Sequence, residues 1–183
     1  MQAAAPGKPV WMVLKGAGWV DFNGLFGPKN HDGQRPTFQE SRFMAYDAIV
    51  RGARGILYWG THYVPKDAAM WKDLMKVVRE LADLQPVLSA PDADIVPSVK
   101  APALVFWGSQ AVQALGKNVD GKTWWLVVNE YPMPVNYTLG NLAAFDGNAY
   151  TETGSGARVT VTGGAIRRDI SGYGVDILKP CAP

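Results

Sequence analysis

Two loops in the first half of the sequence, the first of them glycine-rich, mark the side chains best suited to chemistry. These side chains are Lys15, Trp19 and Asp21 in the first loop, Trp59 just before the second loop, and His62 and Tyr63 within it. The Asp21 carboxylate can act as an acid, a base or a hydroxyl acceptor; a solvated loop aspartate is the alternative. His62 can bind a ligand hydroxyl or make a hydrogen bond within its own loop. The two loops therefore form the candidate site.

Each loop follows a short run of apolar residues. The runs cover 9–14 and 55–59 and contain no charged residue. Continuous apolar runs of this length are typical of parallel strands that are buried on both faces. We expect two such strands, with the candidate residues at or just beyond their carboxyl ends.

Two helices are predicted beside these strands. The first covers 37–51: Thr37 and Glu40 have the spacing of a capping box, and Gly52 suits the helix C-terminus. The second covers 67–84 and ends before Pro86. Its predicted apolar face consists of Leu74, Val78, Leu81 and Leu84 or Gln85. The order strand, loop, helix occurs twice, which indicates two βα units and an α/β region at 1–88.

The composition changes after residue 88. Residues 89–102 contain several prolines and read as a linker, and 103–183 form an all-β region. The Asp120–Gly121 pair predicts a hairpin turn. Short strands at this spacing favour a small antiparallel β-sandwich. The predicted strands are 105–107, 111–115, 123–129, 135–139, 149–153, 158–162, 166–170 and 174–178.

Composition argues against several kinds of ligand and partner. The net charge of +2 and the lack of a basic cluster argue against nucleic acid. No run approaches the roughly 20 apolar residues of a membrane span. His31 and Asp32 have no partners at metal-ligand spacing, so we expect neither a metal nor a cofactor. The first eight residues have no apolar core of signal-peptide length, and the localisation stays open.

The sequence resembles the C-terminal part of a (β/α)8-barrel glycoside hydrolase. The match rests on the run at 9–14, the Pro36-Thr37-x-x-Glu40 helix start, the segment 53–59, and the later β strands with Trp-Leu-Val-Val-Asn at 125–129. The resemblance implies a partial TIM barrel, whose last two strands are 9–14 and 55–59, followed by a β-sandwich. A complete barrel takes about 250 residues, so two units cannot close one.

The resemblance also assigns roles to the strand-end residues. In such enzymes a tryptophan at the end of the eighth strand floors a sugar subsite, which implies this role for Trp59 and a similar one for Trp19. Sugar C–H faces are weakly apolar and can stack on a large ring; core packing is the alternative for both. The nucleophile of the retaining enzymes ends the seventh strand, but here Lys15-Gly-Ala-Gly follows. Asp21, the carboxylate nearest to a strand end, is the catalytic candidate.

Two functions are compatible with the sequence. The first is a glycoside hydrolase-like protein that acts on O-glycosidic bonds of oligo- or polysaccharides when complete, with this chain as one portion. The second is a non-catalytic carbohydrate-binding or structural module, in which Trp124 and Trp125 of the sandwich bind sugar or pack. Two open apolar strands also predict association, either into a homo-oligomer or with the missing barrel portion; the alternative is that this segment is poorly packed.

Overall fold

The computed structural model describes residues 7–22, 34–103 and 110–181. It divides into two compact units, Met1–Asp83 and Leu84–Pro183, and each is described by itself. His31, Asp32 and the predicted strand 105–107 lie outside the described residues. No helix in the described part of the chain is long and apolar enough to cross a membrane.

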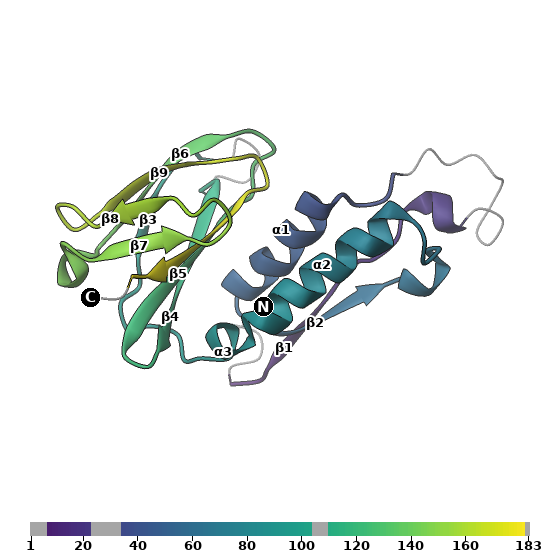
Figure 1. Ribbon diagram of the computed structural model, residues 1–183, viewed down its shortest axis with the longest axis horizontal. Helices are drawn as coiled ribbons and strands as arrows, with labels where there is room; N and C mark the ends of the chain where they lie inside the picture. The colour runs from purple at the N-terminus through teal and green to yellow at the C-terminus, as the bar shows by residue number, and fades with distance from the viewer. Residues whose placement is uncertain (1–6, 23–33, 104–109, 182–183) are drawn as a thin grey trace. The chain divides into compact units, whose positions relative to one another are not determined.

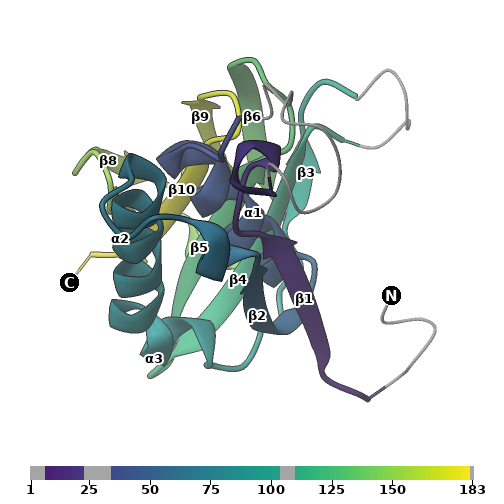
Figure 2. The same ribbon diagram turned by 90° about the vertical axis from the view of Figure 1, so that its right-hand side faces the viewer.

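The first unit contains one parallel strand pair and two main helices. Strand β1 (Val10–Lys15) pairs in parallel with β2 (Ala53–Trp59). Helices α1 (Phe38–Val50) and α2 (Ala69–Asp83) lie along the same face of this pair (Figures 1 and 2). Two strand–helix units are therefore present. Two parallel strands do not define a barrel, so the partial TIM barrel stays a prediction.

The start of α1 confirms the predicted capping box. The Thr37 side chain accepts a hydrogen bond from the Glu40 amide, and the Glu40 carboxylate accepts one from the Thr37 amide. After the helix, Gly52 has a φ of +94°, a conformation that favours glycine. Both ends of α1 are thus determined by local sequence.

The buried face of α2 differs from the predicted one. Met70, Leu74 and Val77 are buried, whereas Val78 is exposed. Leu74 and Leu81 therefore face the core as predicted, but Val77 takes the place predicted for Val78. Val77 and Val78 are adjacent apolar residues, so the sequence did not decide which of them faces the strands.

One face of the β1–β2 pair is open, although both faces were predicted to be buried. Met12, Leu14, Ile56 and Tyr58 pack toward the helices. The opposite face exposes Trp11, Val13, Leu57 and Trp59, each between 50% and 62% exposed. The two helices can cover only one face, and no described segment covers the other. A continuous apolar run indicates that both faces of a strand are apolar, but it does not indicate that both are covered.

The second unit is built from two antiparallel sheets. One has the order β4-β5-β10-β7-β8 and the other β3-β6-β9. The strands are β3 (Ser98–Lys100), β4 (Val112–Val119), β5 (Lys122–Asn129), β6 (Val135–Gly140), β7 (Ala149–Glu152), β8 (Arg158–Thr160), β9 (Ile166–Ile170) and β10 (Val175–Pro180). Asp120 and Gly121 have positive φ angles and form the predicted β4–β5 turn.

The two sheets of the second unit share one core. Trp125, Val127 and Leu178 from the larger sheet pack with residues such as Leu139 and Ile166 from the smaller one. A polar contact also joins the sheets: the Tyr137 hydroxyl and Arg168 Nε both donate to Asp176 Oδ2, at 2.8 and 2.9 Å. The antiparallel character of this region agrees with the prediction.

The segment predicted as a linker is attached to this second unit. The short helix α3 (Gln85–Leu88) precedes this segment, and β3 lies near its end. Lys117, which is fully buried, donates to Asp92 Oδ1 at 2.6 Å and to the Ala90 carbonyl. The domain limits 1–88, 89–102 and 103–183 stay a prediction, but residues 90–93 lie against β4.

Candidate functional site

The carboxyl ends of β1 and β2 meet closely. Lys15 is paired with Trp59, and the Gly16 amide donates to the Trp59 carbonyl at 2.8 Å. A Cβ at Gly16 would lie 2.6 Å from that carbonyl oxygen, so this position requires glycine. All six predicted site residues lie on or just beyond these strand ends: Lys15, Trp19, Asp21, Trp59, His62 and Tyr63.

Asp21 is held in an ion pair with Arg35. It lies in the short 3-10 helix η2 (Trp19–Phe22), and its side chain is only 1% exposed. Arg35 donates from Nη2 to Oδ1 at 2.6 Å and from Nε to both oxygens, and the Gly18 amide donates to Oδ2. These hydrogen bonds and the charge of Asp21 raise the pKa of Arg35. The geometry favours a structural carboxylate over one that reaches a ligand.

Phe22 is the centre of an aromatic cluster that the sequence analysis missed. Its ring stacks on Trp59, with centroids 5.2 Å apart and planes at 25°. It also makes edge contacts with Tyr63 at 4.9 Å and Trp19 at 5.9 Å. Phe22 itself is buried. The spacing of Trp19 and Phe22 within one loop is the signal that could have indicated this cluster.

Trp59 and Trp19 are the exposed members of the cluster. Trp59 is 55% exposed and Trp19 58%. Phe22 packs against Trp59 while more than half of the Trp59 surface stays open, which is the arrangement expected of a stacking platform. Core packing does not account for either indole.

The remaining predicted residues flank this platform. His62 is exposed, and its ring lies 3.8 Å from that of Tyr63. Lys15 is also exposed and donates from Nζ to the Gln34 carbonyl at 3.2 Å. Hydrogen-bonding groups therefore surround the aromatic surface. No group of three or more metal-ligating side chains occurs in the described part of the chain.

The tryptophans of the second unit have other surroundings. Trp125 is fully buried in the sandwich core and makes an edge contact with Phe145 at 5.5 Å, so the packing interpretation holds for it. Trp124 is partly exposed, and Lys179 Nζ lies 5.7 Å from its ring centroid. Only Trp124 of this pair has surface available to a ligand.

Comparison with solved structures places the fold among glycoside hydrolases. An alpha-amylase from Geobacillus thermoleovorans, complexed with acarbose, aligns over 95% of this chain with a TM-score of 0.61 and 8% identity. The noncanonic maltogenic alpha-amylase AmyB from Thermotoga neapolitana aligns over 94%, with a TM-score of 0.59 and 10% identity. A GH30 endoxylanase from Clostridium papyrosolvens aligns over 99%, with a TM-score of 0.50 and 15% identity.

The relationship is one of fold. The chain spans 39%, 41% and 44% of those three structures, respectively. No protein-family model matches the sequence, and no curated protein matches it. The fold comparison agrees with the resemblance to the C-terminal part of a glycoside hydrolase. It does not establish a shared activity at these identities.

Proposed function

We propose that the strand-end surface of the first unit is a carbohydrate-binding site in a glycoside hydrolase-like protein. The observation that carries this proposal is Trp59, which is 55% exposed at the carboxyl end of β2 and backed by Phe22. Ligands of parallel α/β sheets bind at the carboxyl ends of the strands. An exposed indole there offers stacking to a sugar ring, and Lys15, His62 and Tyr63 offer hydrogen bonds to its hydroxyls.

We propose that glycosidic bonds are hydrolysed only when this chain is combined with further βα units. Hydrolysis of a glycosidic bond usually needs two carboxyl groups on either side of the bond. Asp21 is the catalytic candidate of this chain, but its carboxylate is occupied by Arg35 and Gly18. We therefore assign this chain substrate binding, and expect the reacting carboxyl groups to come from further βα units.

Titration with a sugar tests the binding proposal. Maltotriose and xylotriose are suitable probes, because the similar folds include amylases and a xylanase. Trp59→Ala should weaken binding about fivefold, which corresponds to the loss of about 1 kcal/mol of stacking. Trp11→Ala is the matched control. Trp11 is 62% exposed on the same face of the β1–β2 pair, but it lies near the amino end of β1, whereas Trp59 lies at the carboxyl end of β2. Equal loss in both variants, or none, would reject the site.

The sandwich supplies the competing proposal of a non-catalytic binding module. It is favoured by the partial exposure of Trp124 beside Lys179. In that case Trp124→Ala should remove sugar binding and Trp59→Ala should not. Measuring both variants with the same sugars separates the two proposals.

The open face of the β1–β2 pair supports a proposal about partners. Parallel strands are normally covered on both faces, and each large apolar side chain left in water forgoes roughly 1.5–3 kcal/mol. We expect further βα units, or a second copy, to cover Trp11, Val13 and Leu57. Light scattering should show association of the isolated chain, and hydrogen exchange should show weak protection of β1 and β2. A monomer with strongly protected strands would contradict this expectation.

A further inference from the structure

The orientation of Trp59 depends on a contact outside its own strand. Trp59 is the last residue of β2, and more than half of its surface is open. The ring of Phe22 packs on it with centroids 5.2 Å apart. A rigid stacking surface needs such support, because an exposed side chain at a strand end can otherwise change rotamer.

Phe22 is in turn held by its neighbours. On one side lies Gly60, where a Cβ would stand only 3.0 Å from Phe22 Cζ. Asp21 is the residue before Phe22 in the same 3-10 turn. Its carboxylate accepts hydrogen bonds from Arg35 and from the Gly18 amide. Arg35 lies two residues before the capping residue of α1. The ion pair therefore ties the turn that carries Phe22 to the start of a well-capped helix.

We propose that Phe22 is a positioning residue for Trp59 and that the Asp21–Arg35 ion pair sets the position of Phe22. The carboxylate predicted as a catalytic group thus acts at a distance, by fixing the turn that supports the indole. The effect on sugar binding rests on the proposed function; the effect on the orientation of Trp59 does not. The two parts can be measured separately.

Fluorine NMR of the full chain labelled with 5-fluorotryptophan tests the orientation. The resonance of Trp59 is identified among those of the seven tryptophans because it is missing from the Trp59→Phe chain. Phe22→Leu removes a stacked ring and its ring-current shift, so this resonance should move. Asp21→Asn should move or broaden the same resonance, and Arg35→Lys, which keeps the charge but loses the planar fork, should have an intermediate effect.

Phe38→Leu is the matched control. Phe38 lies at the start of α1 near Lys76 and, within the described part of the chain, makes no ring contact with the cluster around Phe22. It should leave the Trp59 resonance in place. Maltotriose titrations of the same variants should show a severalfold loss of affinity for Phe22→Leu and Asp21→Asn only.

The outcomes separate the two proposals. An unchanged Trp59 resonance in both folded Asp21→Asn and Arg35→Lys chains overturns the positioning role, even if Phe22→Leu does not fold. A shifted resonance supports it. If wild type and the Trp59→Ala chain bind maltotriose equally, or neither binds it, the sugar site is rejected, and the resonance shifts still decide the positioning role.

Discussion

The two units of this chain treat their apolar sheet faces in opposite ways. In the second unit two sheets cover one another, and Trp125 and Leu139 are completely buried between them. In the first unit the helices cover one face of β1–β2, and the other face exposes Trp11, Val13 and Leu57. The difference indicates that the second unit holds a closed core, whereas the first leaves one apolar sheet face exposed.

Tryptophan shows the contrast within one residue type. Trp125 packs in a closed core, and its ring contacts Phe145. Trp11 lies flat over Gly55, where a Cβ would come within 2.5 Å of its indole, and remains 62% exposed. The same type of side chain is therefore part of a closed core in one unit and more than half exposed in the other.

The largest effect should come from truncating the buried tryptophan. Trp125→Ala should lower the free energy of unfolding of the second unit by about 3–5 kcal/mol, because it removes a large buried ring and leaves a cavity. Trp11→Ala should change the stability of the first unit by no more than about 0.5 kcal/mol. Urea unfolding followed by hydrogen exchange at β5 and β2 measures each unit separately. A large loss in Trp11→Ala would mean that its open face is already part of a core.

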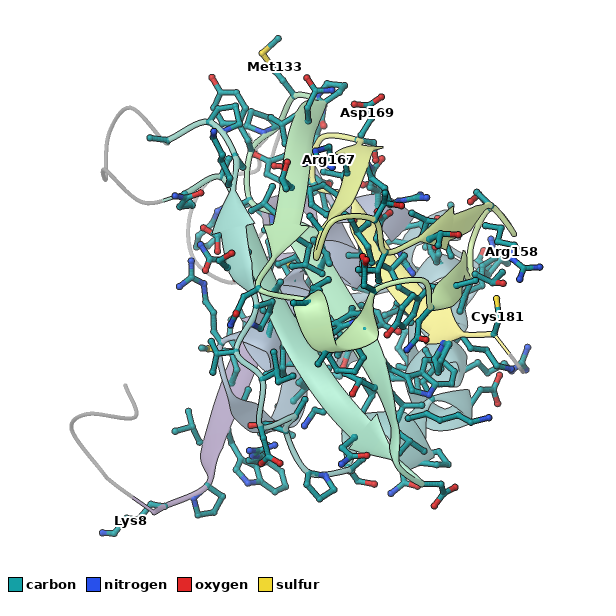
Figure 3. All side chains as sticks on the ribbon, turned by 90° about the vertical axis from the view of Figure 1, so that its left-hand side faces the viewer. Lys8, Met133, Arg158, Arg167, Asp169 and Cys181 are labelled. Atoms are coloured by element: carbon teal, nitrogen blue, oxygen red, sulfur yellow. The ribbon has the colours of Figure 1, made fainter. Side chains whose placement is uncertain are left out.

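The ion pair between the sheets of the second unit should give the next effect. Arg168→Ala leaves the buried Asp176 carboxylate without its cation and should cost about 3 kcal/mol. Arg158→Ala is the control, since Arg158 extends outward from β8 (Figure 3) and is exposed. Urea midpoints of the two variants provide the comparison. Equal midpoints would show that the closed unit does not depend on its internal charges.

Two glycines with nearly equal backbone angles extend the comparison to the strand-end cluster. Gly60 has a φ of +82° and Gly147 one of +83°. Each alanine replacement should cost about 1 kcal/mol through the left-handed backbone. Nothing lies within 4 Å of the added Cβ at Gly147, whereas at Gly60 it would meet Phe22 and Ala17 at 3.0 Å. Gly60→Ala should therefore cost more in thermal melts, and equal losses would contradict close packing around Phe22.

The sequence predicted those features that depend on neighbours along the chain. Thr37 and Glu40 lie three residues apart, and the Asp120–Gly121 turn needs only its own φ angles. Their energetics are local, so the residue types were sufficient. The order of strands and helices followed from the same kind of information.

The missed features depend on contacts between distant residues. Asp21 and Arg35 are 14 residues apart, and no pattern in either segment indicated the pair. The stacking of Phe22 on Trp59 joins two loops. The exposure of Trp11 depends on what covers the sheet, which the apolar run at 9–14 does not state. The candidate residues thus lie at or beyond neighbouring strand ends, as the order of the elements predicted, but the ion pair of Asp21 with Arg35 could not be read from the sequence.

The smallest expected effect is a change in how stability depends on pH, and we expect it in the second unit only. Burial alone would raise the pKa of Glu152, but hydrogen bonds from Ser155 and Gly154 outweigh it and hold that pKa below its usual value. Burial raises the pKa of Asp176, against the opposing charge of Arg168. Both carboxylates belong to the second unit.

These two shifts have opposite consequences for stability. A lowered native pKa gives Glu152 a stabilising contribution above its unfolded pKa that is lost as the pH falls through the folded one. Because the native pKa of Asp176 is raised, the folded state binds a proton there at a higher pH than the unfolded state does. The contribution of Asp176 to stability therefore increases as the pH falls from the folded toward the unfolded pKa. Glu152→Gln should therefore flatten the acid-side loss of stability, and Asp176→Asn should steepen it. Urea midpoints measured between about pH 3 and 7, with hydrogen exchange at β5 and α1, should place both changes in the second unit. A change of the same sign in the two variants, or one located in α1, would contradict the assignment of these charges to the closed core.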